Sequence, residues 1–201
     1  MIIREVAVGG VEQALTAEKQ GAERIELCDN LIEGGTTPSY GVILECKKSL
    51  SIPIVVMIRP RGGDFVYSDL EKRAMLEDVK VCSSLGVDGI AIGMLTQDNN
   101  VDYDFLKKVM SIKGDLKVTF HKAIDQVLDY KNSVYNLKKI GVQRILSSGQ
   151  EDSAIRGINK LKEIDLIEGI ELVVAGKVTK ENLENLKSEL KTESFHGKNI
   201  L

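Results

Sequence analysis

Residues 54–69 read IVVMIRPRGGDFVYSD, and this stretch decides what kind of fold to expect. Its first five residues, Ile54–Ile58, are all apolar, which is typical of a strand in a parallel sheet covered on both faces. The run ends at Arg59. Because Pro60 follows it, a helical conformation is disfavoured at Arg59, and we expect the chain to leave the core there. We therefore expect functional residues at this edge of the sheet. The alternative is a tight turn whose arginines pair with nearby acids.

Short apolar runs alternate with segments of helical periodicity eight times along the chain. This alternation predicts parallel strands joined by right-handed crossovers, and eight such strands can close into a barrel. An open doubly wound sheet is the rival, but no Gly-x-Gly-x-x-Gly motif follows the first strand. The predicted strands are Ile2–Val8, Arg24–Cys28, Ile54–Ile58, Gly89–Gly93, Lys117–His121, Arg144–Ser148, Glu171–Ala175 and Ser194–His196. The predicted helices are Val11–Gln20, Ser39–Leu50, Asp69–Leu85, Asp102–Met110, Ser133–Ile140, Ser153–Ile164 and Thr179–Leu190.

We therefore predict an α/β protein in which residues 1–201 form a single (β/α)8 TIM-type barrel domain. At 201 residues the barrel is compact, since typical examples need about 250. The sequence stops at Leu201, soon after the eighth strand, so we expect it to lack a full final helix. One side of that strand must then be covered in another way. A partner subunit would provide such cover, and we expect a homo-oligomer.

Composition narrows the classes of partner. The chain is 43% hydrophobic and 28% charged, with Lys+Arg 27 against Asp+Glu 30 and a formal net charge of -3. Such a balance gives no overall attraction to nucleic acid or acidic membranes. The start, MIIREVAV, lacks the features of a signal peptide, and three cysteines without paired spacing fit a reducing compartment. We expect a cytoplasmic protein that binds a small molecule, with no nucleic acid and no membrane.

The carboxyl ends of the barrel strands are where ligands bind in this architecture. Glu26 and Cys28 end the second predicted strand and, being two residues apart, share one of its faces. An inward-facing glutamate needs a partner, and we expect Arg59 on the third strand to supply it. A structural ion pair that plugs the barrel is the alternative. Glu5 lies further from the mouth, and for it we favour the structural role.

The other strand ends add histidines and a serine. His121 ends the fifth strand, where an imidazole can serve as acid, base or ligand, or only as a satisfied hydrogen-bonding group. Asp125 either orients His121 or begins the following turn. Ser148 ends the sixth strand. His196, on the eighth, is the weaker candidate because the short tail beyond it is expected to be mobile.

The three cysteines differ in their positions. Cys46 and Cys82 each fall on the apolar stripe of a predicted helix, so we expect both to be small buried hydrophobic residues. Only Cys28 is placed at the mouth. Cu(I) favours soft thiolates, usually two or more, and no Cys-x-x-Cys pair is present. The residues alone therefore give little support for a copper site.

Four stretches, IELCDNLIEGGTTPS, VMIRPRGGDFVYSD, VTFHKAID and RILSSGQ, resemble the CutC copper-homeostasis family in order and across nearly the whole chain. The resemblance implies a cytoplasmic TIM-type barrel, often oligomeric, that is linked to the handling of copper. It also implies Cu(I) binding through cysteines, without an assigned reaction. Carried over to this sequence, it supports as mouth residues Glu26, Cys28, Arg59, Asp64, His121 and Ser148.

Two functions follow. The first, our principal prediction, is copper homeostasis with Cu(I) bound at the barrel mouth by Cys28. The alternative is a TIM-barrel enzyme with lyase-like or isomerase-like chemistry on a small anionic metabolite, with Glu26 and His121 as acid and base. A scaffold that binds a protein partner is a third possibility. The residues predicted to bind the ligand or clamp the anion are Arg59, Arg61, Asp64 and Ser148.

Overall fold

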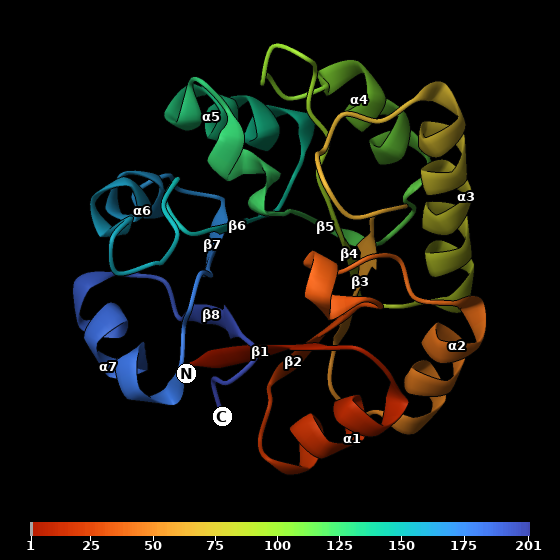
Figure 1. The fold of residues 1–201 in the computed structure, drawn as a ribbon, viewed down its shortest axis with the longest axis horizontal. Helices are drawn as coiled ribbons and strands as arrows, with labels where there is room; N and C mark the ends of the chain where they lie inside the picture. Colours follow the sequence, from red (N-terminus) through yellow and green to blue (C-terminus); the bar gives the residue numbers. More distant parts are fainter. Residues whose placement is uncertain (1) are drawn as a thin grey trace.

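Eight parallel strands pair in chain order and close into a barrel, with β1 beside both β2 and β8 (Figure 1). The computed structural model describes residues 2–201, and it confirms the predicted (β/α)8 fold. The strands are β1 Ile3–Val8, β2 Arg24–Leu27, β3 Ile54–Ile58, β4 Gly89–Ile92, β5 Lys117–Phe120, β6 Arg144–Ser147, β7 Glu171–Val174 and β8 Ser194–Gly197. The α-helices are α1 Val11–Lys19, α2 Tyr40–Ser49, α3 Asp69–Leu85, α4 Tyr103–Ile112, α5 Tyr130–Ile140, α6 Ile158–Asp165 and α7 Lys180–Glu189.

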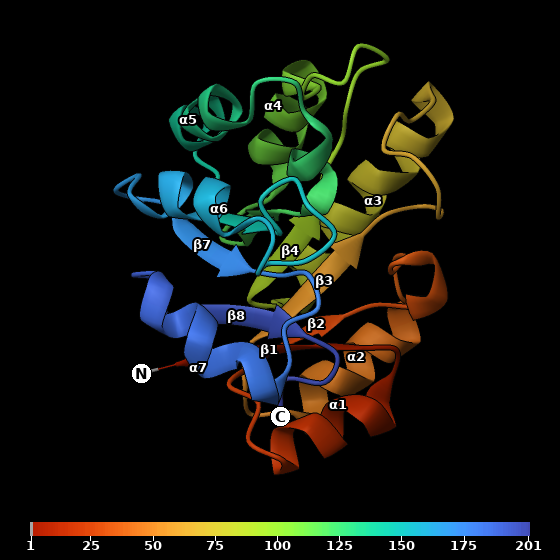
Figure 2. The same cartoon turned by 60° about the vertical axis from the view of Figure 1, so that its left-hand side comes forward.

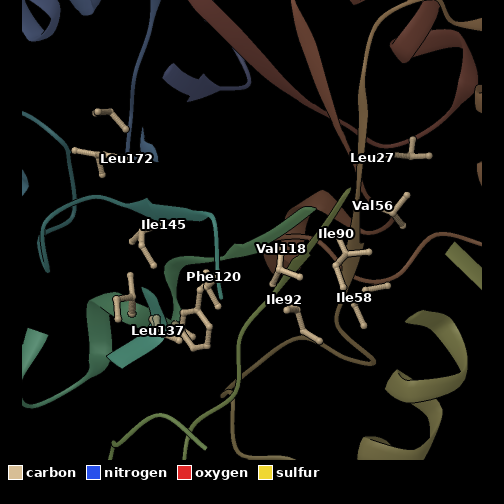
Figure 3. Packing of buried hydrophobic residues seen from close by; sticks show 14 of the residues in the cluster. Leu27, Val56, Ile58, Ile90, Ile92, Val118, Phe120, Leu137, Ile145 and Leu172 are labelled. Carbon is tan, nitrogen blue, oxygen red and sulfur yellow. The ribbon is translucent and has the colours of Figure 1, made fainter. Parts of the chain in front are cut away.

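The main apolar core lies between the strands and the helices. Successive side chains of a strand point to opposite faces, so every second strand residue faces outward. Figure 3 shows Phe120 of β5 and Ile145 of β6 beside Leu137 of α5, all three fully buried. A smaller apolar cluster, containing Val55 and Met57, is separate from this core. Much of the remaining barrel interior is therefore left to polar side chains.

All seven predicted helices form, although α5 begins three residues earlier than predicted and α6 begins later. The Ser68 hydroxyl accepts from the Glu71 N–H, and the Glu71 carboxylate accepts from the Ser68 N–H, which forms the capping box that starts α3. Helix α6 begins at Ile158, five residues later than predicted. The preceding turn runs so close to the barrel that a Cβ on Gly157 would lie 1.9 Å from the Ser148 carbonyl oxygen. That contact leaves no room for an earlier helix. The 3-10 turns η1 Leu31–Glu33 and η2 Lys122–Gln126 were not predicted.

The outer side of β8 is covered without an eighth helix. Figure 1 shows no helix between α7 and α1, where both ends of the described chain lie, and in Figure 2 the strands run in one common direction. Phe195 of β8 is nevertheless fully buried, because Ile200 joins the core and Leu201 packs against it. The chain's own last residues thus belong to the core that buries this strand. Within residues 2–201, no helix has both the length and the apolar character needed to cross a membrane.

Candidate functional site

A cavity of about 410 Å³ opens at the carboxyl ends of the strands. Four predicted site residues line it, namely Glu26, Arg59, His121 and Ser148, and His196 lines it as well. The other three predicted residues, Cys28, Arg61 and Asp64, are not among its lining residues. The cavity therefore brings together most of the predicted set and adds a histidine that the sequence ranked low.

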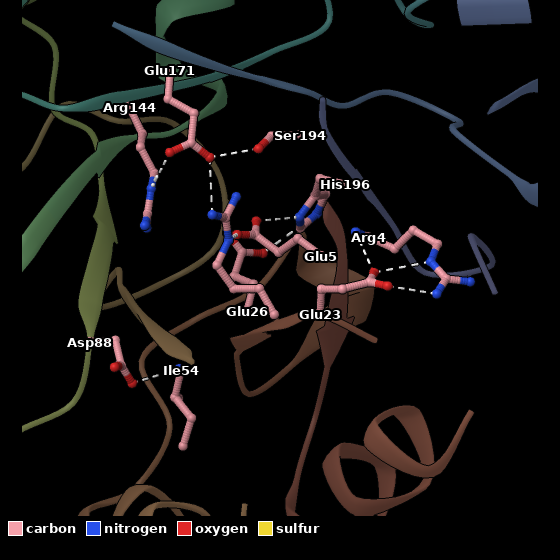
Figure 4. A network of polar contacts seen from close by, with 11 residues as sticks. Arg4, Glu5, Glu23, Glu26, Ile54, Asp88, Arg144, Glu171, Ser194 and His196 are labelled. Carbon is pink, nitrogen blue, oxygen red and sulfur yellow. Dashed lines mark hydrogen bonds and ion pairs between the residues drawn. The ribbon is translucent and has the colours of Figure 1, made fainter. Parts of the chain in front are cut away.

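Glu26, His196 and Glu5 form a polar centre, in which Glu26 and His196 line the cavity and the buried Glu5 contacts His196 (Figure 4). The Nδ1 atom of His196 lies 2.8 Å from Glu5 Oε1, and its Nε2 atom lies 3.6 Å from Glu26 Oε2. The predicted Glu26–Arg59 pair is wrong, because Glu26 lies beside His196 and the terminal nitrogens of Arg59 donate to backbone carbonyl oxygens. Register explains the neighbourhood, since Glu5 pairs with His196 across β1 and β8.

An interior polar chain continues from this centre through the barrel. The Arg24 guanidinium donates from Nε to Glu5 and from Nη1 to Glu171 Oε1 at 3.0 Å. Glu171 also accepts from Arg144 Nε at 3.0 Å and from the Ser194 hydroxyl at 2.6 Å. We call Glu171, Arg24, Glu5, His196 and Glu26 the interior polar chain. It fixes His196 from behind, so the histidine is ordered rather than part of a mobile tail.

Burial and charge set the protonation of this chain. Burial alone would raise the pKa of Glu5, but His196 and Arg24 hold it at about 2. Burial raises the pKa of the Glu26 carboxyl, and the charge of His196 offsets this only in part. The pKa of His196 is raised despite burial, because the Glu26 and Glu5 carboxylates favour the imidazolium. Burial and charge therefore raise the pKa of both Glu26 and His196, so each group holds its proton to a higher pH than it would in water. Two interacting groups of this kind are typical of sites that exchange protons.

Arg59 is buried and committed to backbone carbonyls. Its Nη1 donates to the carbonyl oxygens of Glu33 at 2.7 Å and Gly35 at 3.0 Å, and its Nη2 donates to that of Gly63 at 2.7 Å. Its guanidinium also lies 5.0 Å from the centre of the Phe65 ring. Arg59 thus joins the loops after β2 and β3 at the rim of the cavity.

Arg61 follows the alternative that the sequence left open for this turn. It pairs with Glu71 at 2.6 Å and with Asp64 at 3.0 Å, and it is partly exposed. These local acids lower the number of donors that Arg61 could offer to a ligand. Its role, and that of Asp64, as ligand-binding residues remains a prediction.

His121 is placed by a glycine. A Cβ on Gly93 would lie 2.4 Å from the His121 ring, so only glycine at the end of β4 lets the imidazole turn there. His121 Nδ1 accepts from the Ala123 N–H at 3.2 Å, which puts the proton on Nε2. Burial, assisted by the charge of Arg59, lowers the pKa of His121 to about 3. His121 is therefore a neutral hydrogen-bond donor, and its buried Nε2 has no partner among residues 2–201.

Asp125 does not orient His121 but organises the loop after β6. Its carboxylate accepts from the Ser147 hydroxyl at 2.5 Å, the Ser148 N–H at 3.0 Å and the Gln150 N–H at 3.0 Å. The Ser148 hydroxyl donates to the same carboxylate at 3.0 Å. Asp125 lies within the 3-10 turn η2, which starts at Lys122, and from there it holds Ser148 and the loop after β6.

Cys28 is a buried thiol beside Glu26. Its Sγ lies 3.6 Å from Glu26 Oε2, and a Cβ on Gly35 would approach the sulfur to 3.0 Å. Burial and the nearby carboxylate raise the pKa of Cys28 well above its ordinary value. Cys46 and Cys82 belong to the outer core, as predicted, whereas Cys28 belongs to the separate interior cluster. The chain therefore does not form a pair of thiolates, the donor set that Cu(I) favours.

Oxygen and nitrogen donors are better placed than sulfur to hold a metal ion. One ligand atom each from Glu5, Glu26 and His196 lie within 4.8 Å of one another. Carboxylate and imidazole ligands suit harder divalent cations rather than Cu(I). In the chain as described, however, Glu5 and His196 are bound to each other and Glu5 is also held by Arg24.

The fold and the site define a class: a (β/α)8 barrel with a buried carboxylate–imidazole centre at its mouth. The CutC family model matches residues 2–200, so the chain belongs to the CutC family. Proteins named copper homeostasis protein cutC homolog from Mus musculus and Homo sapiens are each 42% identical to it over 196 residues. These alignments cover 96% of this chain and 72% of each relative.

Solved structures agree with this assignment. A structure from Streptococcus agalactiae, named as a CutC copper homeostasis protein, superposes with a TM-score of 0.95 at 38% identity and covers 100% of both chains. A phosphonopyruvate hydrolase bound to oxalate and Mg²⁺ superposes with a TM-score of 0.70 at 14% identity, covering 98% of this chain and 76% of that one. At that identity the likeness concerns the fold alone.

Proposed function

We propose that the mouth of the barrel is the active site of an enzyme that moves a proton on a small polar metabolite, within the copper-homeostasis role that the relatives' names state. One observation carries this proposal. Glu26 and His196 stand 3.6 Å apart on the lining of the cavity, and Glu5 holds the far nitrogen of the imidazole at 2.8 Å. A carboxylate behind an imidazole fixes its orientation and supports its charge, which is how a general acid or base is prepared.

The roles follow from the contacts. Glu26, buried and with a raised pKa, is proposed as the group that exchanges a proton with the substrate. His196 shares that proton, and Glu5 and Arg24 are positioning residues behind it. His121 is proposed to donate from its neutral Nε2–H to an oxygen of the substrate, rather than to serve as a base. Such a set suits isomerase-like or lyase-like chemistry.

Deuterium incorporation tests this proposal directly. Purified protein is incubated in D₂O with a metabolite extract, and mass spectrometry identifies the compounds that are consumed or gain deuterium. Glu26→Gln should lower the rate by about 100-fold or more, because it removes the exchanging proton while preserving shape. Glu184→Gln, on the exposed face of α7, is the matched control and should behave as the parent. Equal rates for the parent and Glu26→Gln would contradict the assignment.

Cu(I) binding by Cys28 is the second candidate. The relatives' names favour it, and Cys28 shares an interior cluster with the thioether of Met57, a further soft donor. Its test is competition for Cu(I) against a strong chelator. Cys28→Ser should abolish binding, whereas Cys46→Ser, which changes a buried thiol on α2, should not. Binding that is unchanged in Cys28→Ser would remove this candidate.

The setting of the protein is also proposed. A cytoplasmic location is supported by three free thiols, which a reducing compartment maintains. We also propose a homo-oligomer. A partner subunit is not required to cover β8, however, because residues at the end of the chain already belong to the core around that strand. Light scattering of the purified protein measures the subunit number. The formal charge of -3 supports partners other than nucleic acid or membranes.

A further inference from the structure

The contacts around the cavity identify the chemical class of its ligand. Resting on the proposed function, we infer that the substrate is an uncharged compound rich in hydroxyl groups. The sequence alone predicts an anion clamped by Arg59 and Arg61. The side-chain contacts favour a ligand that both donates and accepts hydrogen bonds.

An anion finds little to bind in this cavity. The terminal nitrogens of Arg59 already donate to three carbonyl oxygens, which leaves only its buried Nε without a partner in the described chain, and Arg61 is paired outside the lining. Besides Arg59, the lining carries Lys122 and His196, together with the carboxylates of Glu33 and Glu151. An anionic ligand would be repelled by those carboxylates. It would also find no arginine able to bind it through two parallel N–H groups.

A cation is disfavoured for the converse reason. The carboxylate of Asp125 already accepts from the Ser147 hydroxyl and from the backbone N–H groups of Ser148 and Gln150. Glu26 faces the imidazole of His196, whose raised pKa favours its charged form. A cationic ligand would therefore stand beside the positive charges of Lys122, Arg59 and His196.

A polyhydroxylated compound matches what remains. His121 is only 4% exposed, and its Nε2–H is a donor without a partner in the described chain. Glu26 and Glu33 are acceptors on the same lining. A hydroxyl group can accept from the former and donate to the latter, which neither an anion nor an ammonium group can do. The apolar part of the lining, Phe65, Met57 and Leu146, suits the C–H surface of such a compound.

Isothermal titration calorimetry with defined probes tests the class. Glucose and myo-inositol represent uncharged polyols, oxalate and inorganic phosphate represent anions, and putrescine represents cations, each titrated at millimolar concentration. We expect saturable binding heat for at least one polyol and weak or absent binding heat for the charged probes. Glu33→Gln should weaken polyol binding several-fold, because it removes an acceptor at the rim. Glu184→Gln should leave binding unchanged.

The outcomes separate this inference from the proposed function. Tighter binding of oxalate, phosphate or putrescine than of either polyol overturns the inferred class, as does the absence of binding by both polyols. Neither result touches the acid–base pair. That pair is tested by the NMR titration of His196 in Glu26→Gln, and an unchanged His196 pKa would overturn the proposed function instead. The chain has only two histidines, so the signals can be assigned with His121→Gln.

Discussion

The two histidines of the barrel mouth stand in opposite environments. On the β8 side, His196 lies between the carboxylates of Glu5 and Glu26, and its pKa is raised. On the β5 side, His121 is buried against Phe65 near the charge of Arg59, and its pKa falls to about 3. Both residues end a parallel strand and both line one cavity. The difference shows that the end of a strand brings an imidazole to the mouth of the barrel, whereas the charge and burial of its neighbours set its protonation state.

This division also separates two roles at the mouth. An imidazole coupled to a buried carboxylate can exchange protons near neutrality, and a neutral imidazole with a free N–H can polarise an oxygen. The same cavity thus offers a proton-exchanging side and a hydrogen-bond-donating side. Each of the following predictions breaks or sharpens this contrast.

The largest effect is expected where the interior polar chain is cut. Arg24→Met removes the cation that holds both the buried Glu5 and the half-buried Glu171, so Glu5 keeps only His196 to compensate its buried charge. We expect the free energy of unfolding, measured in urea, to fall by about 3–5 kcal/mol. Arg4→Met, which breaks the more exposed Arg4–Glu23 pair, is the control and should cost about 1 kcal/mol or less. Equal losses in the two variants would show that the interior polar chain stabilises the fold no more than an exposed ion pair does.

The next effect is a pH dependence of opposite sign for the two histidines. Because the pKa of folded His121 is below 6.5, its contribution to stability is complete above pH 6.5 and is lost as the pH falls from there toward 3. His121→Gln should therefore flatten the acid side of the stability profile, which changes by up to about 1.4 kcal/mol per pH unit.

His196 provides the contrast. Its folded pKa is above 6.5, so its contribution is complete below pH 6.5 and is lost as the pH rises through the folded pKa. His196→Gln should cost most stability at mildly acidic pH and least in alkaline solution. Urea midpoints recorded between pH 3 and pH 9 measure both profiles. Parallel profiles for the two variants would remove the contrast.

A third prediction concerns the coupling within the pair. Glu26→Gln removes the carboxylate that favours the imidazolium, so the pKa of His196 should fall while that of His121 stays unchanged. Proton NMR titration resolves the two rings. The same variant should be as stable as the parent or more stable above neutral pH, because a buried carboxyl with a raised pKa disfavours folding once it ionises.

The smallest effect should come from the rim arginine that lies outside the cavity. Arg61→Gln breaks pairs with partly or fully exposed acids, so the urea midpoint should hardly move. Arg59→Gln, which leaves three carbonyl oxygens without a donor, should lower it clearly. A larger loss for Arg61→Gln than for Arg59→Gln would reverse our assignment of the two side chains.

The sequence predicted which residues lie at the barrel mouth better than it predicted which residues they contact. Glu26, Arg59, His121 and Ser148 were placed at the mouth because each ends an apolar strand, and all four line the cavity. His196 was ranked low, and Glu5 was assigned a structural role away from the mouth. A signal was present in Arg24, Arg144 and Glu171, charged residues at inward positions of otherwise apolar strands. Such residues must find partners inside the barrel, and Glu5 and His196 belong to the same network.

By itself, the amino-acid sequence determined the barrel, its strand and helix order, the caps and the outer apolar core, because these depend on local periodicity and on residues close in the chain. Only the tertiary structure decided that His196 meets Glu5, 191 residues away, and that Arg59 binds carbonyl oxygens rather than Glu26. Side-chain pairing across a barrel depends on strand register and loop path, which place distant residues within about 3 Å of each other. Local sequence carries no record of those distances.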